Sequence, residues 1–127
     1  MLSDMRVATA LPAQDLERAK LFYKEKLDLS PVSERPDGVY YECGDKTTFF
    51  VFPSSGQSRA EFTQMGFEVD DVEETVRELS ERGVVFEQYD YDWLKTDERG
   101  IAEIEGERGA WFKDSEGNLI AVGESTS

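Results

Sequence analysis

The sequence predicts an α+β domain built from two tandem units, each with the order strand, helix and three strands (βαβββ). The main observation is an internal repeat, in which Asp15 and Asp71 each follow an apolar run and precede a stretch with helical spacing. The later turn and strand of Gly44–Phe52 correspond in the same way to Ser115–Gly123. The second unit is longer between these two landmarks, which indicates an insertion within Asp90–Glu105. Because neither unit can bury its apolar face alone, the two must pack together, and their seam is a natural place for a ligand cavity.

The first unit covers about residues 5–53 and begins with the apolar run Val7–Leu11, which predicts a strand. Asp15 is a typical N-cap residue, and apolar residues recur after it at helical spacing as far as Leu27. Asp28 stands where a residue in the left-handed conformation often ends a helix. Turn signals then separate three predicted strands, around Ser30–Glu34, Val39–Cys43 and Thr47–Phe52.

The second unit covers about residues 62–124 and is joined to the first by a polar linker, residues 53–61. Asp71 and Glu74 have the spacing of a capping box at the start of a helix, and Gly83 is placed to end that helix. The predicted strands of this unit are Met65–Val69, Val84–Tyr89 and a final hairpin of Ala110–Phe112 and Asn118–Val122.

Composition limits the possible functions. The length fits one compact domain over residues 1–127, and no apolar run is long enough for a membrane span. The net charge of −14 repels phosphate groups, so we expect no nucleic-acid or membrane partner. Cys43 is the only cysteine, which excludes an internal disulfide and favours the reducing cytoplasm. The sequence contains no histidine, so the commonest general base and metal ligand is absent.

Three parts of the chain carry a family resemblance: Asp15–Tyr23 with Leu27–Leu29, Phe67–Val72, and Trp111–Ile120. With them the chain resembles, over nearly its whole length, the glyoxalase/bleomycin-resistance/extradiol-dioxygenase superfamily, also called the vicinal oxygen chelate fold. Asp28 and Ser115 depart from the family pattern, which usually has glycine and proline there. The resemblance implies that the two βαβββ modules form a half-open curled sheet with the helices outside, and that a ligand binds on its concave face.

Metal-dependent members of that family hold the ion with His, Gln or Glu side chains at four equivalent strand positions. Carried over to this sequence, those positions are Ala8, Phe50, Gln64 and Ala121. Three of these side chains have no lone pair, and one glutamine cannot hold a divalent metal by itself. We therefore expect no metal at this site and no other cofactor. The alternative is a metal held by displaced ligands such as Glu42, Gln64 and Glu68.

Strand alternation predicts which side chains line the cavity, because successive residues of a strand face opposite sides. The expected ligand-binding residues are Ala8, Phe50, Phe52, Gln64, Trp93, Trp111 and Ala121. Gln64 is either a ligand contact or a buried amide bonded to neighbouring backbone. Trp111 is expected in the core or the cavity wall. Trp93 belongs to the insertion, where it either covers the cavity mouth or packs on a partner subunit.

Glu68 is the one carboxylate that the alternation places inside the cavity. A partly desolvated carboxylate can act as a base or bind a cationic ligand, so Glu68 is the candidate catalytic residue. The alternative is that Glu68 lies at the open end of its strand and is solvated.

These observations favour a cytoplasmic protein that binds a small apolar or aromatic molecule in the barrel cavity without the usual metal. One alternative is a lyase, isomerase or dioxygenase-type enzyme that uses Glu68 or displaced metal ligands. Another is a scaffold whose cavity is filled by side chains. We also expect a homodimer, because the exposed edges of curled sheets invite pairing. The modules then pair either within one chain or across a swapped dimer.

Overall fold

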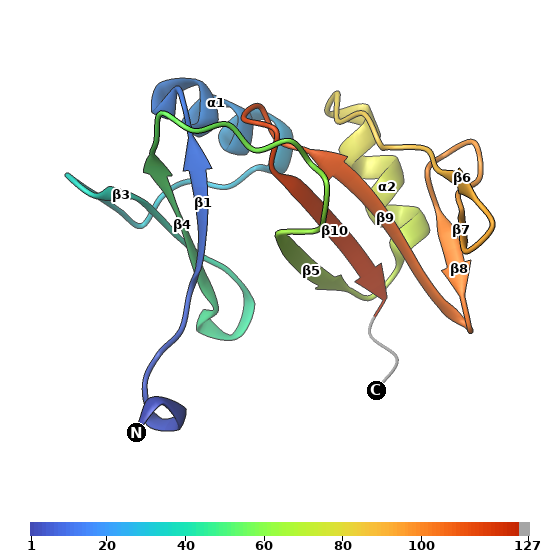
Figure 1. Cartoon of the computed structure of the whole chain (residues 1–127), viewed down its shortest axis with the longest axis horizontal. Helices are drawn as coiled ribbons and strands as arrows, with labels where there is room; N and C mark the ends of the chain where they lie inside the picture. The colour runs from blue at the N-terminus through green and yellow to red at the C-terminus, as the bar shows by residue number, and fades with distance from the viewer. Residues whose placement is uncertain (125–127) are drawn as a thin grey trace.

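The computed structural model describes residues 1–124 and confirms the predicted α+β fold, with two α-helices and two four-stranded mixed sheets (Figure 1). Module one contains β1 (Thr9–Ala13), α1 (Leu16–Leu27), β2 (Ser33–Arg35), β3 (Gly38–Glu42) and β4 (Thr48–Pro53). Module two contains β5 (Met65–Val69), α2 (Val72–Glu81), β6 (Asp90–Tyr91), β7 (Leu94–Lys95), β8 (Ala102–Ile104), β9 (Glu107–Lys113) and β10 (Leu119–Glu124).

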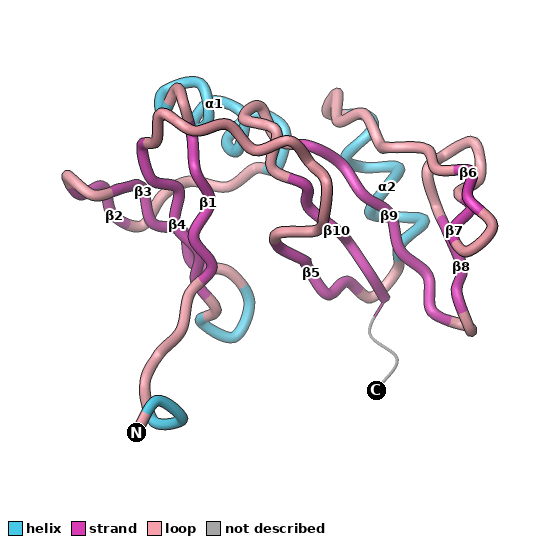
Figure 2. The backbone as a smooth tube through the Cα atoms, viewed as in Figure 1, coloured by secondary structure: helices cyan, strands magenta, loops and turns pink. Residues whose placement is uncertain are grey.

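The two sheets repeat one strand order, as the internal repeat predicts. Sheet one has the order β1-β4-β3-β2, and sheet two has the order β5-β10-β9-β8. In each sheet the first strand of the module pairs in parallel with the last strand, and the other pairs are antiparallel. Figure 2 shows the two sets of strands as separate groups joined by the linker. Within residues 1–124 no strand of sheet one pairs with a strand of sheet two, so one chain forms no closed barrel.

Both helices begin at the aspartates that the sequence predicts. Each cap carboxylate accepts a hydrogen bond from the amide three residues further on, at 3.0 Å for Asp15 and 3.2 Å for Asp71. Asp28 ends α1 in the left-handed conformation, with a φ of 57°. The capping box of α2 is only half formed, because the Glu74 carboxylate is engaged in an ion pair with Arg77.

The prediction of one strand over Val84–Tyr89 is wrong. Of the described residues in that stretch, only Phe86 forms a β-bridge, opposite Phe112 of β9. The other half of β9 pairs with β8, which follows the insertion. The insertion therefore interrupts this strand of the sheet, and its own residues form the small hairpin of β6 and β7 beyond β9 (Figure 1).

The core joins the two modules through the helix-facing sides of both sheets. Tyr23 of α1 packs against Tyr41 and Phe49 of sheet one. Phe49 in turn meets Phe67 of sheet two edge-on, with ring centroids 6.3 Å apart. We call the other side of each sheet, away from the helices, its open face. Because the shared core lies on the helix-facing sides, the two open faces of one chain do not face each other.

Candidate functional site

The open face of sheet one carries a row of aromatic side chains. Tyr40 of β3 and Phe50 of β4 lie opposite each other and stack, with ring centroids 5.0 Å apart. Phe52 lies 6.3 Å from Phe50, and the Arg35 guanidinium lies 4.5 Å from the centre of the Tyr40 ring. Ala8 and Phe50 help to line a hollow of about 420 Å³ on this face. We call Tyr40, Phe50 and Phe52 the aromatic row of module one, and it offers a flat apolar surface to a ligand.

The open face of sheet two combines small residues with one large ring. Gly66, Ala121 and Trp111 lie side by side in register across β5, β10 and β9. A Cβ atom added to Gly66 would meet no atom nearer than 3.9 Å, so the space in front of it is open. The Trp111 indole lies over Gly109, since its Cη2 atom is 3.9 Å from the position that a Cβ would take there. This face is therefore an open floor of small residues bordered by an aromatic ring.

The aromatic border continues into the insertion. Tyr89 meets Trp111 edge-on with ring centroids 5.8 Å apart, and Tyr91 follows Tyr89 at 6.0 Å. Trp93 stacks on Tyr91 with centroids 5.4 Å apart and ring planes only 5° from parallel. Tyr91 is 52% exposed and Trp93 72% exposed, so the outer rings face solvent. We call Trp111, Tyr89, Tyr91 and Trp93 the aromatic row of module two.

The structure places the expected ligand-binding residues in two groups. Ala8, Phe50 and Phe52 lie on or beside the open face of sheet one. Trp111 and Ala121 lie on the open face of sheet two, with Trp93 on the neighbouring hairpin. Since the two open faces do not face each other, one chain alone does not enclose a cavity lined by both groups.

Sequence reasoning missed three aromatic residues of these rows: Tyr40, Tyr89 and Tyr91. Alternation in β3 allows either Tyr40 or Tyr41 on the open face, and the register of Tyr40 with Phe50 decides between them. Tyr89, Tyr91 and Trp93 recur at every second residue, and this clustering of aromatic residues is the signal that the sequence offers. The ring contacts of the structure, not strand alternation, place the three rings in one row, because Trp93 lies in the turn between β6 and β7.

Gln64 belongs to a polar network between the modules. Its Nε2 group donates to Ser58 Oγ at 3.1 Å and to Asn118 Oδ1 at 2.9 Å, and its Oε1 accepts from the Leu119 amide at 3.1 Å. Asn118 is fully buried and donates from Nδ2 to the Pro12 carbonyl of module one at 3.0 Å. Gln64 is half-buried, and its amide bonds to one backbone group and two side chains.

Asp114 connects this network to α1. The Tyr23 hydroxyl donates to Asp114 Oδ2 at 2.6 Å, and Asp114 Oδ1 accepts from the amides of Glu116 and Asn118. Burial, and after it the Asp114 charge, raises the pKa of Tyr23 well above its ordinary value. The Tyr23 hydroxyl therefore keeps its proton and remains a donor to the carboxylate.

Glu116 forms a second link between the modules. Its carboxylate accepts two hydrogen bonds from the Arg18 guanidinium, at 2.8 and 3.0 Å, and one each from the Asp15 amide and the Ser115 hydroxyl. Burial raises the pKa of Glu116, but these bonds and the Arg18 charge outweigh it and lower the pKa to about 2. We call Tyr23, Gln64, Asp114, Glu116 and Asn118 the module junction. The most family-like segment, Trp111–Ile120, thus supplies most of the junction.

Glu68 has an exposed side chain at the seam between the modules. It borders a hollow of about 500 Å³, together with Thr48, Gly66 and Cys43. Burial raises the pKa of the Cys43 thiol, which therefore stays protonated at neutral pH. The exposure of Glu68 fits the solvated alternative of the sequence analysis better than a desolvated base.

The four positions that the family resemblance implies for metal ligands do not fit a metal ion. Ala8, Phe50 and Ala121 have no donor atom in their side chains, and both polar atoms of the Gln64 amide are in hydrogen bonds. Of the displaced ligands that the sequence suggested, Glu42 lies on β3 of sheet one and Glu68 on β5 of sheet two. Among residues 1–124, no group of three or more His, Cys, Asp or Glu side chains is placed to hold a metal ion.

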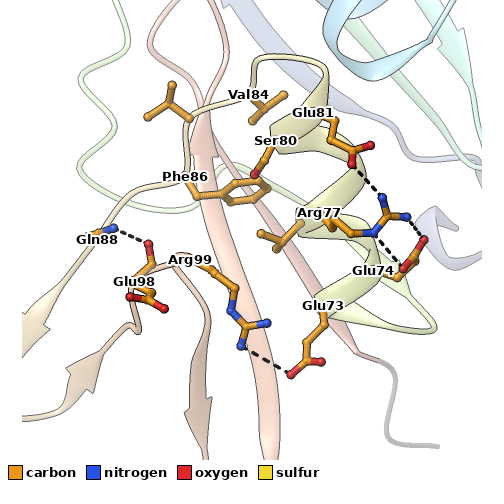
Figure 3. A pocket seen from close by; sticks show the side chains of 12 residues that line it. Glu73, Glu74, Arg77, Ser80, Glu81, Val84, Phe86, Gln88, Glu98 and Arg99 are labelled. Carbon is orange, nitrogen blue, oxygen red and sulfur yellow. Dashed lines mark hydrogen bonds and ion pairs between the residues drawn. The ribbon is translucent and has the colours of Figure 1, made fainter.

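A larger hollow, of about 860 Å³, lies between α2 and the insertion (Figure 3). Several of its charged side chains are paired with one another. Arg77 pairs with Glu74 and Glu81, and Arg99 pairs with Glu73. Because these pairs neutralise both arginines of the lining, the hollow has little free charge with which to recognise an anionic ligand, and we assign it no ligand.

The tandem βαβββ modules, each with one mixed sheet and one covering helix, define a paired-module α+β protein with an apolar open face on each module. The chain belongs to the glyoxalase/bleomycin resistance protein/dioxygenase superfamily, whose family model matches residues 7–122.

Solved structures of this superfamily's fold are similar to the chain. UcmS2 has a TM-score of 0.74 at 17% identity, over 95% of this chain and 100% of its own. Lactoylglutathione lyase from Agrobacterium tumefaciens has a TM-score of 0.67 at 24% identity, over 95% and 93%. The fosfomycin resistance protein FosX from Listeria monocytogenes has a TM-score of 0.66 at 16% identity, over 96% and 93%. At these identities the likeness shows the fold alone. Among curated proteins, none matches the chain in sequence.

Proposed function

We propose that this protein binds a small, planar, apolar or aromatic molecule on its open faces without a metal ion. The observation that carries the proposal is the aromatic row on each open face, one beside Ala8 and the other beside the small-residue floor of Gly66 and Ala121. Exposed ring faces stack on planar ligands, and small residues leave room for them. The absence of donor atoms at Ala8, Phe50 and Ala121 supports binding without a metal.

In this proposal a second copy of the chain completes the site. One open face covers only one side of a flat ligand, and the two open faces of a chain do not face each other. In a two-fold dimer, sheet one of each chain faces sheet two of its partner, and the facing aromatic rows enclose two equivalent cavities. β1 and β5 are edge strands whose free backbone groups are available for pairing between chains.

Sedimentation of the purified chain at micromolar concentration is expected to show a homodimer. The physical reason is that the apolar rows and the sheet edges are covered only when two copies associate. A protein that sediments as a monomer, and that still binds ligand, would show that one chain's open face suffices and that the second copy is not needed.

Enlarging Ala121 or Ala8 to leucine is expected to abolish binding of the neutral fluorescent probe N-phenyl-1-naphthylamine. Ala121 lies on the open face and is only partly buried, so Ala121→Leu should change the free energy of unfolding by less than the roughly 1–3 kcal/mol of an overpacked core. Ala110 on the neighbouring strand is fully buried on the helix-facing side, and Ala110→Leu is the matched control that should destabilise the protein by that amount. Probe fluorescence and urea unfolding measure the two effects.

The outcomes of this experiment separate the other function classes. Strong destabilisation by both Ala121→Leu and Ala8→Leu would mean that the cavity is filled, as in a bare scaffold. The runner-up is a lyase, isomerase or dioxygenase-type enzyme with Glu68 as its base, since Glu68 borders the hollow at the seam. In a binding protein, Glu68→Gln leaves probe binding unchanged.

We also propose a cytoplasmic location, because the single Cys43 is a free thiol that suits a reducing compartment. No helix among residues 1–124 has the length and apolar character needed to cross a membrane.

A further inference from the structure

A hollow of about 360 Å³ lies on the helix-facing side of the molecule, where the two modules meet. Module one lines it with Leu27 and Leu29 at the end of α1, and with Cys43 directly after β3. Module two lines it with residues that include Val69 of β5 and Leu79 of α2. We call it the helix-side hollow. It is separate from the open faces, on which the proposed function depends.

The apolar side chains around the helix-side hollow are incompletely packed. Leu27, Leu29, Phe67, Val69 and Leu79 all border the apolar core, but each is only half-buried. Protein interiors are normally close-packed and leave few voids larger than a water molecule. A volume of this size instead falls within the roughly 300–1,000 Å³ that small-molecule sites occupy.

The polar groups of the lining favour an uncharged, apolar occupant. The Thr75 hydroxyl donates to the Asp71 carbonyl at 2.9 Å, and the Cys43 amide donates to the Thr47 carbonyl at 2.7 Å, so both donors are in use. Among the described residues that line the hollow, Glu68 is the only charged one, and no cation is present to bind an anion. Apolar cavities with few polar partners hold water poorly and accept apolar molecules.

The walls of the helix-side hollow are mainly aliphatic. Its two rings, Phe67 and Phe112, each meet another core ring edge-on: Phe67 meets Phe49, and Phe112 meets Phe86. The other apolar side chains of the lining are leucines and valines: Leu27, Leu29, Val69, Leu79 and Val122. Such walls contact a rounded molecule by dispersion on several sides, whereas the aromatic rows of the open faces fit flat molecules.

We propose that the helix-side hollow is a second ligand site, and that it takes a compact, neutral, aliphatic molecule of the size of a bicyclic ketone. Because the two modules supply opposite walls, a bound molecule adds apolar contacts between them and stabilises the folded chain. This site differs from the open faces in place and in ligand shape, so the two sites bind independently.

The test uses the full chain, the neutral bicyclic ketone camphor and its anionic analogue camphor-10-sulfonate. Cys43 is the only cysteine and lines the hollow, so the rate of its alkylation by N-ethylmaleimide reports occupancy in intact-mass measurements. Millimolar camphor is expected to slow this alkylation about fivefold and to raise the midpoint of thermal unfolding by about 3 °C. Camphor-10-sulfonate should do neither.

Substitutions at Thr75, which is half-buried on α2 and lines the hollow, fill it in steps. Camphor protection of Cys43 should persist in Thr75→Val, weaken in Thr75→Leu and be lost in Thr75→Phe. If the phenylalanine variant does not fold, the leucine variant still decides. Thr48→Phe is the matched control, because Thr48 lines the neighbouring hollow of about 500 Å³ but not the helix-side hollow. It should keep full protection.

The outcomes are independent of the proposed function. Protection that survives in Thr75→Phe but is lost in Thr48→Phe would place camphor in the neighbouring hollow, and the inference would be wrong. Equal protection by camphor-10-sulfonate overturns the preference for a neutral ligand. If camphor neither protects Cys43 nor raises the unfolding midpoint of the wild-type protein, the second site is wrong. N-phenyl-1-naphthylamine on the open faces should not be displaced by camphor, and Ala121→Leu should leave camphor protection unchanged.

Discussion

The Asn118→Ala variant is expected to be less stable than the wild-type protein by about 3 kcal/mol. The fully buried Asn118 side chain bonds to Pro12, Ser58, Gln64 and Asp114. Alanine removes all four hydrogen bonds and leaves the carbonyl of Pro12 and the amide of Gln64 short of a partner. A buried polar group without a partner lowers the free energy of unfolding by more than a typical intact hydrogen bond raises it. Urea unfolding followed by circular dichroism measures the change.

The control for this prediction is Gln57→Ala in the linker. Gln57 is exposed, so its loss should change the free energy of unfolding by no more than about 0.5 kcal/mol. Equally small effects of both substitutions would contradict the role of Asn118 in holding the modules together.

The Gly117→Ala variant is expected to be destabilised by about 3 kcal/mol as well. Gly117 has a φ of 85°, which an L-amino acid adopts only at a cost. In addition, a Cβ atom at this position would stand 2.4 Å from the Ser58 carbonyl oxygen, so the linker or the turn must shift. The two effects add, because the first is local to Gly117 and the second lies between the turn and the linker.

Gly106 provides a matched control with the same backbone conformation. Its φ is also 85°, but a Cβ atom there would meet no atom within 4 Å. Gly106→Ala should therefore lower the free energy of unfolding only by the cost of a left-handed backbone in alanine, about 1 kcal/mol. The difference between the two variants, measured by thermal unfolding, is the cost of the contact with Ser58. Equal losses of stability in Gly117→Ala and Gly106→Ala would show that the linker at Ser58 moves away from the new Cβ atom without a cost in free energy.

The elements of the fold were predictable where their causes are local. Asp15 and Asp71 each cap a helix because an N-cap needs only a side-chain acceptor and the amides of the next turn. The faces of β10 were predictable from alternation, which puts Ala121 on the open face and the fully buried Ile120 on the helix-facing side. The prediction of a strand over Val84–Tyr89 was wrong because alternation cannot reveal that the chain leaves the sheet after Phe86.

The candidate site was predictable only in part. The lack of donor atoms at Ala8, Phe50 and Ala121 is a property of residue type, which the sequence states directly. Gln64 has a donor and an acceptor group, so its role depended on which neighbours it meets. In the structure its amide bonds to Ser58 of the linker and to Asn118 of module two, and Asn118 in turn bonds to module one.

The sequence by itself determined the repeat, the start of both helices, the alternation of faces along β10 and the residue types at the four positions that the family resemblance implies for metal ligands. These follow from short-range rules of capping, turn formation and alternation. Only the tertiary structure decided which faces of the modules meet, because that depends on contacts between distant residues. The hydrogen bond from Tyr23 to Asp114 joins positions 91 apart in the chain, and no local pattern predicts it. Such contacts turn the helix-facing sides of both sheets into one core, and they leave the aromatic rows on outward faces.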